Sequence, residues 1–107
     1  MISLLLAAAV ALPNDAAQVI QVTAKKFEFS PAVIELKVGV PVVLEVSSLD
    51  RKHGFALPDF KIDEHVEAGA LTRIRIVPDR PGTFAFHCSV FCGSGHEEMG
   101  GTIVVKP

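Results

Sequence analysis

The sequence predicts an all-β protein, a Greek-key β-sandwich of seven or eight strands. Apolar residues alternate with polar ones in several short segments, and turn-forming residues separate these segments roughly every eight to twelve positions. No window sustains the periodicity of an amphipathic helix. Short strands at this spacing are typical of sandwiches. A chain of 107 residues is long enough for one domain with one modest core.

The alternation is visible in five segments. Their inward-facing residues are Ile34, Leu36 and Val38; Val42, Leu44 and Val46; Thr72, Ile74 and Ile76; Phe84 and Phe86; and Ile103 and Val105. Side chains along a strand point alternately to opposite faces. We therefore expect Cys88 to continue the inward face of Phe86 at the end of its strand, and His87 to point away.

The first seventeen residues differ in composition from the rest. Residues 2–12 are almost entirely apolar, but this run is too short for a membrane-spanning helix, which needs roughly 20 residues. It matches the hydrophobic region of a secretory signal with candidate cleavage points after Ala11 or Ala17, although no Lys or Arg precedes it. An N-terminal helix is the alternative.

We expect residues 1–17 to be a signal peptide or an N-terminal apolar segment, and residues 18–107 to be the folded domain. The protein is then exported, to the periplasm or elsewhere outside the cytoplasm, with no transmembrane span of its own and with membrane association left open. Ten basic and twelve acidic residues give a formal net charge of −2. That balance argues against a nucleic-acid partner.

The stretch FHCSVFCGSGHEEMGG, residues 86–101, concentrates metal-binding residue types. It holds both cysteines, two of the four histidines and one of the two methionines of the chain. Cys88, Cys92, His96 and Met99 follow one another at intervals of four, four and three positions. A loop with these intervals and with several glycines for sharp bends can turn all four side chains toward one point.

Three interpretations of this stretch compete. A disulfide between Cys88 and Cys92 suits an exported protein but leaves His96 and Met99 unexplained. Zinc would take two cysteines and two histidines and would not need the thioether of Met99. Copper is expected to bind thiolate, imidazole and a weak axial methionine, which matches the whole set.

A copper site needs a second imidazole from elsewhere in the chain. His53 is the best candidate, because it follows the strand at 42–46 in what reads as a turn, and such turns gather at the ends of a sandwich. His65 lies among charged residues and is expected to be a solvated loop side chain. His87 is expected at the surface from its strand phase.

These residues resemble a known pattern. The motif C-S-x-x-C-G-x-x-H-x-x-M, which runs here from Cys88 to Met99, is similar to the binuclear CuA motif of cytochrome c oxidase subunit II and, in a variant, of nitrous oxide reductase. Asp50, His53, Phe55 and Pro58 resemble the same family's first-histidine loop. The resemblance covers residues 18–106 as a cupredoxin domain. Blue copper proteins are similar in fold but use one cysteine.

The resemblance implies a site with two copper ions. Cys88 and Cys92 would bridge the two ions, and His53 and His96 would each cap one of them. Met99 and the backbone carbonyl of Val90 would be weak ligands, one to each copper. Asp50 would lie near His53 without binding metal.

The sequence also departs from the family. Subunit II usually has a glutamate at the position of Val90, where its side chain contacts a magnesium ion at the boundary with subunit I, and a valine cannot do so. The tryptophan associated with electron entry has no counterpart, because the chain contains no Trp. The two transmembrane helices of subunit II are not found either. We therefore expect a free-standing CuA-type cupredoxin.

Two functions remain open at this point. One is an electron carrier or electron-entry module that exchanges single electrons with a redox partner such as a cytochrome c or a terminal oxidase or reductase, and that is not an enzyme by itself. The other is a periplasmic copper storage or delivery protein. For the carrier, we expect Phe91, Leu57 and Pro58 to form an apolar patch around His96.

Overall fold

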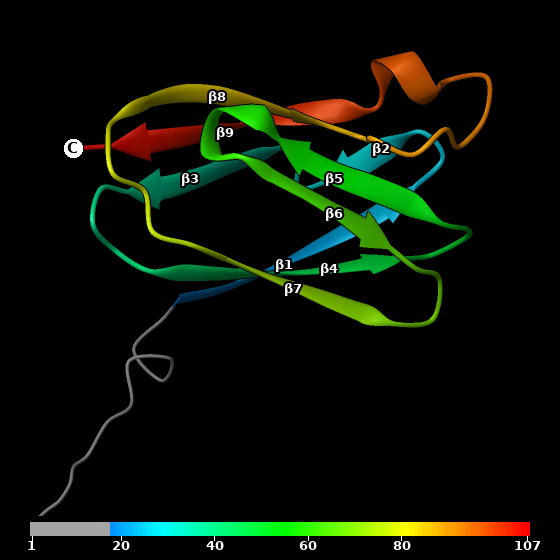
Figure 1. Ribbon diagram of the computed structural model, residues 1–107, viewed down its shortest axis with the longest axis horizontal. Helices are drawn as coiled ribbons and strands as arrows, with labels where there is room; N and C mark the ends of the chain where they lie inside the picture. Colours follow the sequence, from blue (N-terminus) through cyan, green and yellow to red (C-terminus); the bar gives the residue numbers. More distant parts are fainter. Residues whose placement is uncertain (1–17) are drawn as a thin grey trace, which may run out of the picture.

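The computed structural model describes residues 18–107, and this part of the chain forms nine strands in two sheets (Figure 1). One sheet has the order β2 (Glu28–Ser30), β1 (Gln18–Lys25), β4 (Val42–Ser48) and β7 (Leu71–Ile76). The other has the order β3 (Val33–Lys37), β9 (Gly100–Lys106), β8 (Gly82–His87), β5 (His53–Leu57) and β6 (Ile62–Val66). Two short 3₁₀ helices are η2 (Pro58–Phe60) and η3 (His96–Glu98).

The strands pair in both directions. β1 pairs with β4 and β3 with β9 in parallel, and the remaining pairs are antiparallel. Because β3 and β4 follow one another but belong to different sheets, the chain crosses between the layers. The predicted all-β sandwich is confirmed. The strand count exceeds the expected seven or eight, and β2, with three residues, is the shortest strand.

The predicted signal peptide at residues 1–17 lies outside the described residues. Within residues 18–107, no helix has the length and apolar character needed to cross a membrane.

The inward faces agree with the two-residue period of the sequence. In β4 the buried residues alternate with half-buried ones, and in β3 with exposed ones. In β8 Phe86 is buried and His87 exposed, and the next residue, Cys88, is buried. The strand phase therefore delivers Cys88 to the inside of the sandwich, as expected.

The segment from His53 to His65 differs from the expectation. His53 is the first residue of β5 and does not lie in a turn, and His65 lies within β6 and not in a loop. All five residues of β5 are buried, so both faces of this strand, which lies between β8 and β6, are shielded from solvent. A strand buried on both faces shows no polar alternation in the sequence. β6 is an edge strand with mostly exposed residues, so its apolar signal is weak.

Three phenylalanines form the core next to Cys88. Phe29 of β2 makes edge-to-face contacts with Phe55 and Phe86, with ring centroids 5.8 and 5.2 Å away. Phe55 and Phe86, on neighbouring strands of the other sheet, are stacked at 4.8 Å. Such pairs contribute beyond their buried area. They join the two sheets.

This cluster predicts a large stability loss on truncation of Phe55. Phe55→Ala should lower the free energy of unfolding of the metal-free protein by about 3–5 kcal/mol, because it leaves a cavity between the sheets. Phe91, which is 71% exposed, supplies the control: Phe91→Ala should change stability by less than about 0.5 kcal/mol. Urea denaturation measures both. Equal losses for the two variants would contradict the packing described here.

Candidate metal centre

Six predicted residues meet at one end of the sandwich. His53 begins β5, Cys88 follows β8 directly, and the others belong to the loop between β8 and β9 or to its η3 turn. The set is His53, Cys88, Val90, Cys92, His96 and Met99.

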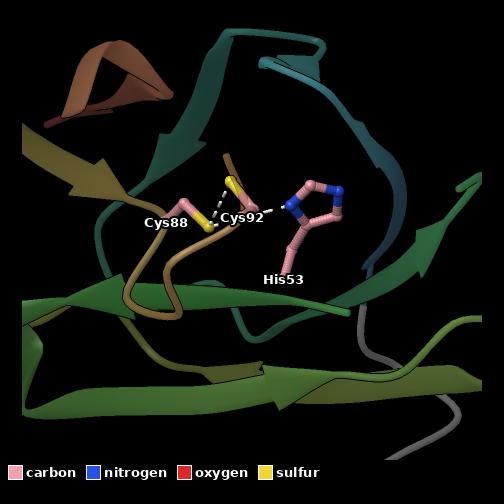
Figure 2. A group of neighbouring side chains, drawn as sticks. All are labelled: His53, Cys88 and Cys92. Atoms are coloured by element: carbon pink, nitrogen blue, oxygen red, sulfur yellow. Dashed lines mark hydrogen bonds between the residues drawn. The ribbon is translucent and has the colours of Figure 1, made fainter. Parts of the chain in front are cut away.

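The two cysteine sulfurs form the middle of this cluster. Cys88 Sγ and Cys92 Sγ are 3.6 Å apart, and both thiols are free. A disulfide would place the two sulfurs about 2 Å apart, so the pair is not covalently joined here. His53 directs Nδ1 toward Cys88 Sγ at 3.8 Å (Figure 2). His53, Cys88 and Cys92 together form a group whose donor atoms could hold a metal ion.

Each sulfur has two further donors beside it. Cys88 Sγ lies 3.8 Å from Nδ1 of His53 and 3.1 Å from the carbonyl oxygen of Val90. Cys92 Sγ lies 3.6 Å from Nδ1 of His96 and 3.7 Å from Sδ of Met99. The arrangement is therefore two similar halves, each with one thiol, one imidazole and one weak donor.

The cluster is largely closed to solvent. His53, Cys88, Cys92 and Met99 are all buried, whereas His96 is half-buried. His96 is thus the donor with an edge toward the surface. Phe91 is exposed, and its ring lies 5.4 Å from the ring of His96.

Asp50 fixes the orientation of the buried His53. Its Oδ1 lies 2.7 Å from Nε2 of His53, and its carboxylate also accepts backbone N–H groups from Lys26 and Arg51. Partial burial acts to raise the pKa of Asp50, but these hydrogen bonds outweigh it and hold the pKa well below its ordinary value. An ionised Asp50 accepts a hydrogen bond from the N–H group at Nε2, which leaves the Nδ1 lone pair facing Cys88.

Burial acts in the opposite direction on Cys92. It raises the pKa of the Cys92 thiol from an ordinary 9.0 to about 11, and the adjacent Cys88 contributes through its hydrogen bond and its charge. In the metal-free protein this residue is therefore a neutral thiol near neutral pH. A metal ion that binds the sulfur must displace the proton.

The loop between β8 and β9 is held by its own backbone. Cys88 N–H donates to the Met99 carbonyl at 2.9 Å, which closes the loop one step beyond the strand ladder. Inside it, His96 N–H and Met99 N–H donate to the carbonyls of Gly93 and His96, each at 3.1 Å. These bonds form the η3 turn that sets the spacing of His96 and Met99.

A glycine lets β5 approach this loop closely. A Cβ at Gly54 would collide with the side chain of Ser89 and would lie 2.9 Å from the backbone nitrogen of Val90. Gly54 N–H instead points at Cys88 Sγ, 3.4 Å away. Ser89 is held from the other side by a 2.8 Å hydrogen bond from its hydroxyl to Asp63 of β6.

The remaining histidines lie outside the cluster, as predicted. His65 and His87 are exposed and are not among its donors. The expected apolar patch needs one correction: Leu57 is buried in β5, so only Pro58 and Phe91 of the three proposed residues are exposed. Lys26 and Asp63 carry no recognisable sequence signal, because their contacts join residues far apart in the chain.

Comparison with known proteins places the chain among related domains. A family model described as a cupredoxin-like domain matches residues 1–105. Cytochrome c oxidase subunit 2 of Thermus thermophilus is 37% identical over 87 residues, which cover 81% of this chain and 64% of that protein. Nitrous-oxide reductase of Cupriavidus necator is 31% identical over 91 residues, which cover 81% of this chain and 14% of that enzyme.

A solved structure shares the fold. The periplasmic domain of subunit II of cytochrome oxidase from Bradyrhizobium japonicum superposes with a TM-score of 0.77 at 22% identity, over 84% of each chain. The protein described here belongs to the cupredoxin-like domain family. The predicted likeness to oxidase subunit II and to nitrous-oxide reductase is confirmed, although the chain spans only part of either relative.

The family and the donor set together support copper as the metal. Soft thiol sulfurs, imidazole nitrogens and a thioether are the ligands that copper prefers in such folds, and all are present at one point. A zinc site would leave the thioether of Met99 and the carbonyl of Val90 without a role.

The raised pKa of Cys92 predicts that alkali destabilises the metal-free protein. The folded state holds this proton more tightly than the unfolded chain, so the stabilisation is complete below pH 9.0 and is lost as the pH rises to about 11. Urea denaturation at successive pH values should show the free energy of unfolding of the wild type falling across this window relative to that of Cys92→Ser. If the difference in free energy of unfolding between the two proteins does not change with pH, the raised pKa of Cys92 is contradicted.

Proposed function

We propose that this protein is an electron-transfer protein with a binuclear CuA-type copper centre that works outside the cytoplasm. The observation that supports this most strongly is the paired arrangement around the two sulfurs. Each thiol has its own imidazole and its own weak donor, and the two sulfurs are close enough to be shared. A site for one metal ion would not require both halves.

In this proposal Cys88 and Cys92 would hold both copper ions, and His53 and His96 would each hold one of them. Met99 would be a weak ligand in one half, and the carbonyl oxygen of Val90 in the other. Both imidazoles present Nδ1 to the sulfurs. A copper pair held by these residues would supply one-electron redox chemistry. The protein buries four of the six donor residues and holds the set on strands and short turns.

Rigidity is the property that electron transfer requires of the chain. Donors that stay in place when the charge of the site changes keep the structural rearrangement small. Here Cys88 continues β8, His53 begins β5, and hydrogen bonds within the backbone set His96 and Met99. In each half of the site, protein donors surround the position of the metal and leave no obvious place for a substrate. Such a site suits electron exchange better than reaction of a bound molecule. We therefore expect no catalysis by this domain alone.

The half-buried His96 suggests the route of exchange. Its exposed edge and the neighbouring Phe91 face the surface at the end of the sandwich. A large exposed aromatic side chain beside a buried redox site is the kind of apolar feature that marks a transient protein contact. We propose that a redox partner, such as a cytochrome c or a terminal oxidase or reductase, docks here. Export follows from residues 1–17, if they act as a signal.

Copper content tests the binuclear proposal. The copper-loaded wild type should hold about two copper ions per chain, and Cys88→Ser or Cys92→Ser should abolish the pair, because a serine hydroxyl does not ionise near neutral pH or bridge as a soft donor. Elemental analysis after removal of loose metal measures this.

The matched controls are the two exposed histidines. His65→Ala and His87→Ala should retain the wild-type copper content, since neither residue is among the donors. One copper per wild-type chain would reject the binuclear centre. Copper that is bound as colourless Cu(I) and released readily to a chelator would instead support storage or delivery.

Docking at Phe91 is tested separately. Phe91→Ser should slow electron exchange with a soluble cytochrome c by about tenfold, the effect of losing about 1.4 kcal/mol of contact energy, without changing the copper spectrum. Val77, an exposed residue beyond the end of β7, provides the control: Val77→Ser should leave the rate unchanged. Unaltered exchange in Phe91→Ser would place the docking surface elsewhere.

A further inference from the structure

A two-residue turn from the other sheet touches both donor-bearing segments. Lys26 and Phe27 connect β1 to β2, and neither belongs to the donor set. In Figure 1 this turn (cyan) and the loop between β8 and β9 (orange) lie at the same end of the sandwich, and the contacts below join them.

The Lys26 side of the turn is connected to His53 through the carboxylate of Asp50. Lys26 N–H donates to Oδ2 of Asp50 at 2.7 Å, and Oδ1 of the same carboxylate lies 2.7 Å from Nε2 of His53. One carboxylate thus joins the turn and the imidazole through its two oxygens. A second backbone bond, from Leu49 N–H to the Ala24 carbonyl at 2.9 Å, holds the segment before Asp50 against β1.

The Phe27 side of the turn reaches the segment between Cys92 and His96. A Cβ at Gly93 would lie 2.8 and 2.9 Å from two atoms of the Phe27 ring, and a Cβ at Gly95 would lie 2.5 Å from two others. The ring therefore lies flush against the loop backbone at both glycines. Real Cβ atoms essentially never lie under 3.0 Å from another heavy atom, so the loop must carry glycine at both positions while the ring is in place.

This contact supplies support that the loop lacks internally. The hydrogen bonds of η3 connect residues three apart, so they shape the turn but do not fix it relative to His53. Phe27 sits on the turn that also holds Asp50. A shift of Phe27 would move the His96 segment, and a shift of Lys26 would release the carboxylate that orients His53.

We propose that the Lys26-Phe27 turn is a brace that sets the two imidazoles, His53 and His96, relative to each other, and that Phe27 is a positioning residue for the segment from Cys92 to His96. The consequence for copper rests on the function proposed above, whereas the brace itself is a property of the metal-free protein. Deletion of the ring loosens one half of the centre while the strands stay intact.

A size exchange between Phe27 and Gly95 tests the brace in the metal-free protein. Gly95 has a φ of −96°, which alanine adopts without strain, so Gly95→Ala acts through its methyl group alone. The amide protons of His96, Glu98 and Met99 are hydrogen-bonded within the loop and report its order through their exchange rates. NMR-detected hydrogen exchange measures them residue by residue.

We expect Phe27→Ala and Gly95→Ala each to raise exchange at these amides by about tenfold or more. In the Phe27→Ala background, Gly95→Ala should add less than about twofold, because the ring it would strike is gone. Phe84→Ala is the matched control: Phe84 is another half-buried phenylalanine, packed on Phe60 four residues before Cys88. It should lower overall stability without selectively raising exchange in the loop.

Additive effects of the two substitutions, or loop amides that do not respond to Phe27→Ala, would overturn the brace. If Phe27→Ala fails to fold, Phe27→Leu replaces it and the same non-additivity is required. Copper titration of the folded variants then separates the two proposals. The brace predicts copper affinity at least about tenfold weaker than wild type with unchanged ion count. A wild type that binds no copper pair rejects the function and leaves the exchange result standing.

Discussion

The hydrogen bond between Cys88 N–H and the Met99 carbonyl is the contact on which the centre depends. It adds one step to the ladder of β8 and β9, which already pairs His87 with Gly100, and so closes the loop that carries Cys92 and His96. Closing a loop costs conformational entropy. The pairing of β8, which has six residues, with β9, which has seven, offsets that cost. Cys88 and Met99, at the two ends of the loop, are therefore fixed by the sheet, whereas Cys92 and His96 need support from outside it.

That support comes from the opposite sheet. The turn after β1 contacts the loop through Phe27 and contacts Asp50 through a backbone N–H group. Asp50 in turn orients a fully buried His53, whose ring would otherwise place an unsatisfied N–H group in the interior. The site thus lies between the layers, and both sheets contribute to its geometry. Burial raises the pKa of the Cys92 thiol, so a metal ion that binds this sulfur must displace its proton.

The sequence predicted the fold class and the grouping of Cys88, Cys92, His96 and Met99, because both depend on local patterns. Val90 was expected there only from the family resemblance. Two-residue alternation gives the phase of β8 and hence the inward direction of Cys88, and the spacing within one loop keeps Cys92, His96 and Met99 together. His53 lies beside the cysteines, as expected, but it belongs to a strand and not to a turn. β5 is buried on both faces, so its sequence has no polar alternation to detect. Phe27 and Asp63 could not be predicted, because their contacts depend on how the two sheets stack and how β5 and β6 pair.

Electron paramagnetic resonance of the copper-loaded, partly reduced protein tests the central claim most directly. If the two sulfurs bridge two copper ions, one unpaired electron is shared between them. The spectrum should then show hyperfine splitting from two equivalent copper nuclei, and Cys92→Ser should lose that pattern. Splitting from a single copper nucleus in the wild type would contradict the shared centre, even if the fold and the donor cluster are as described.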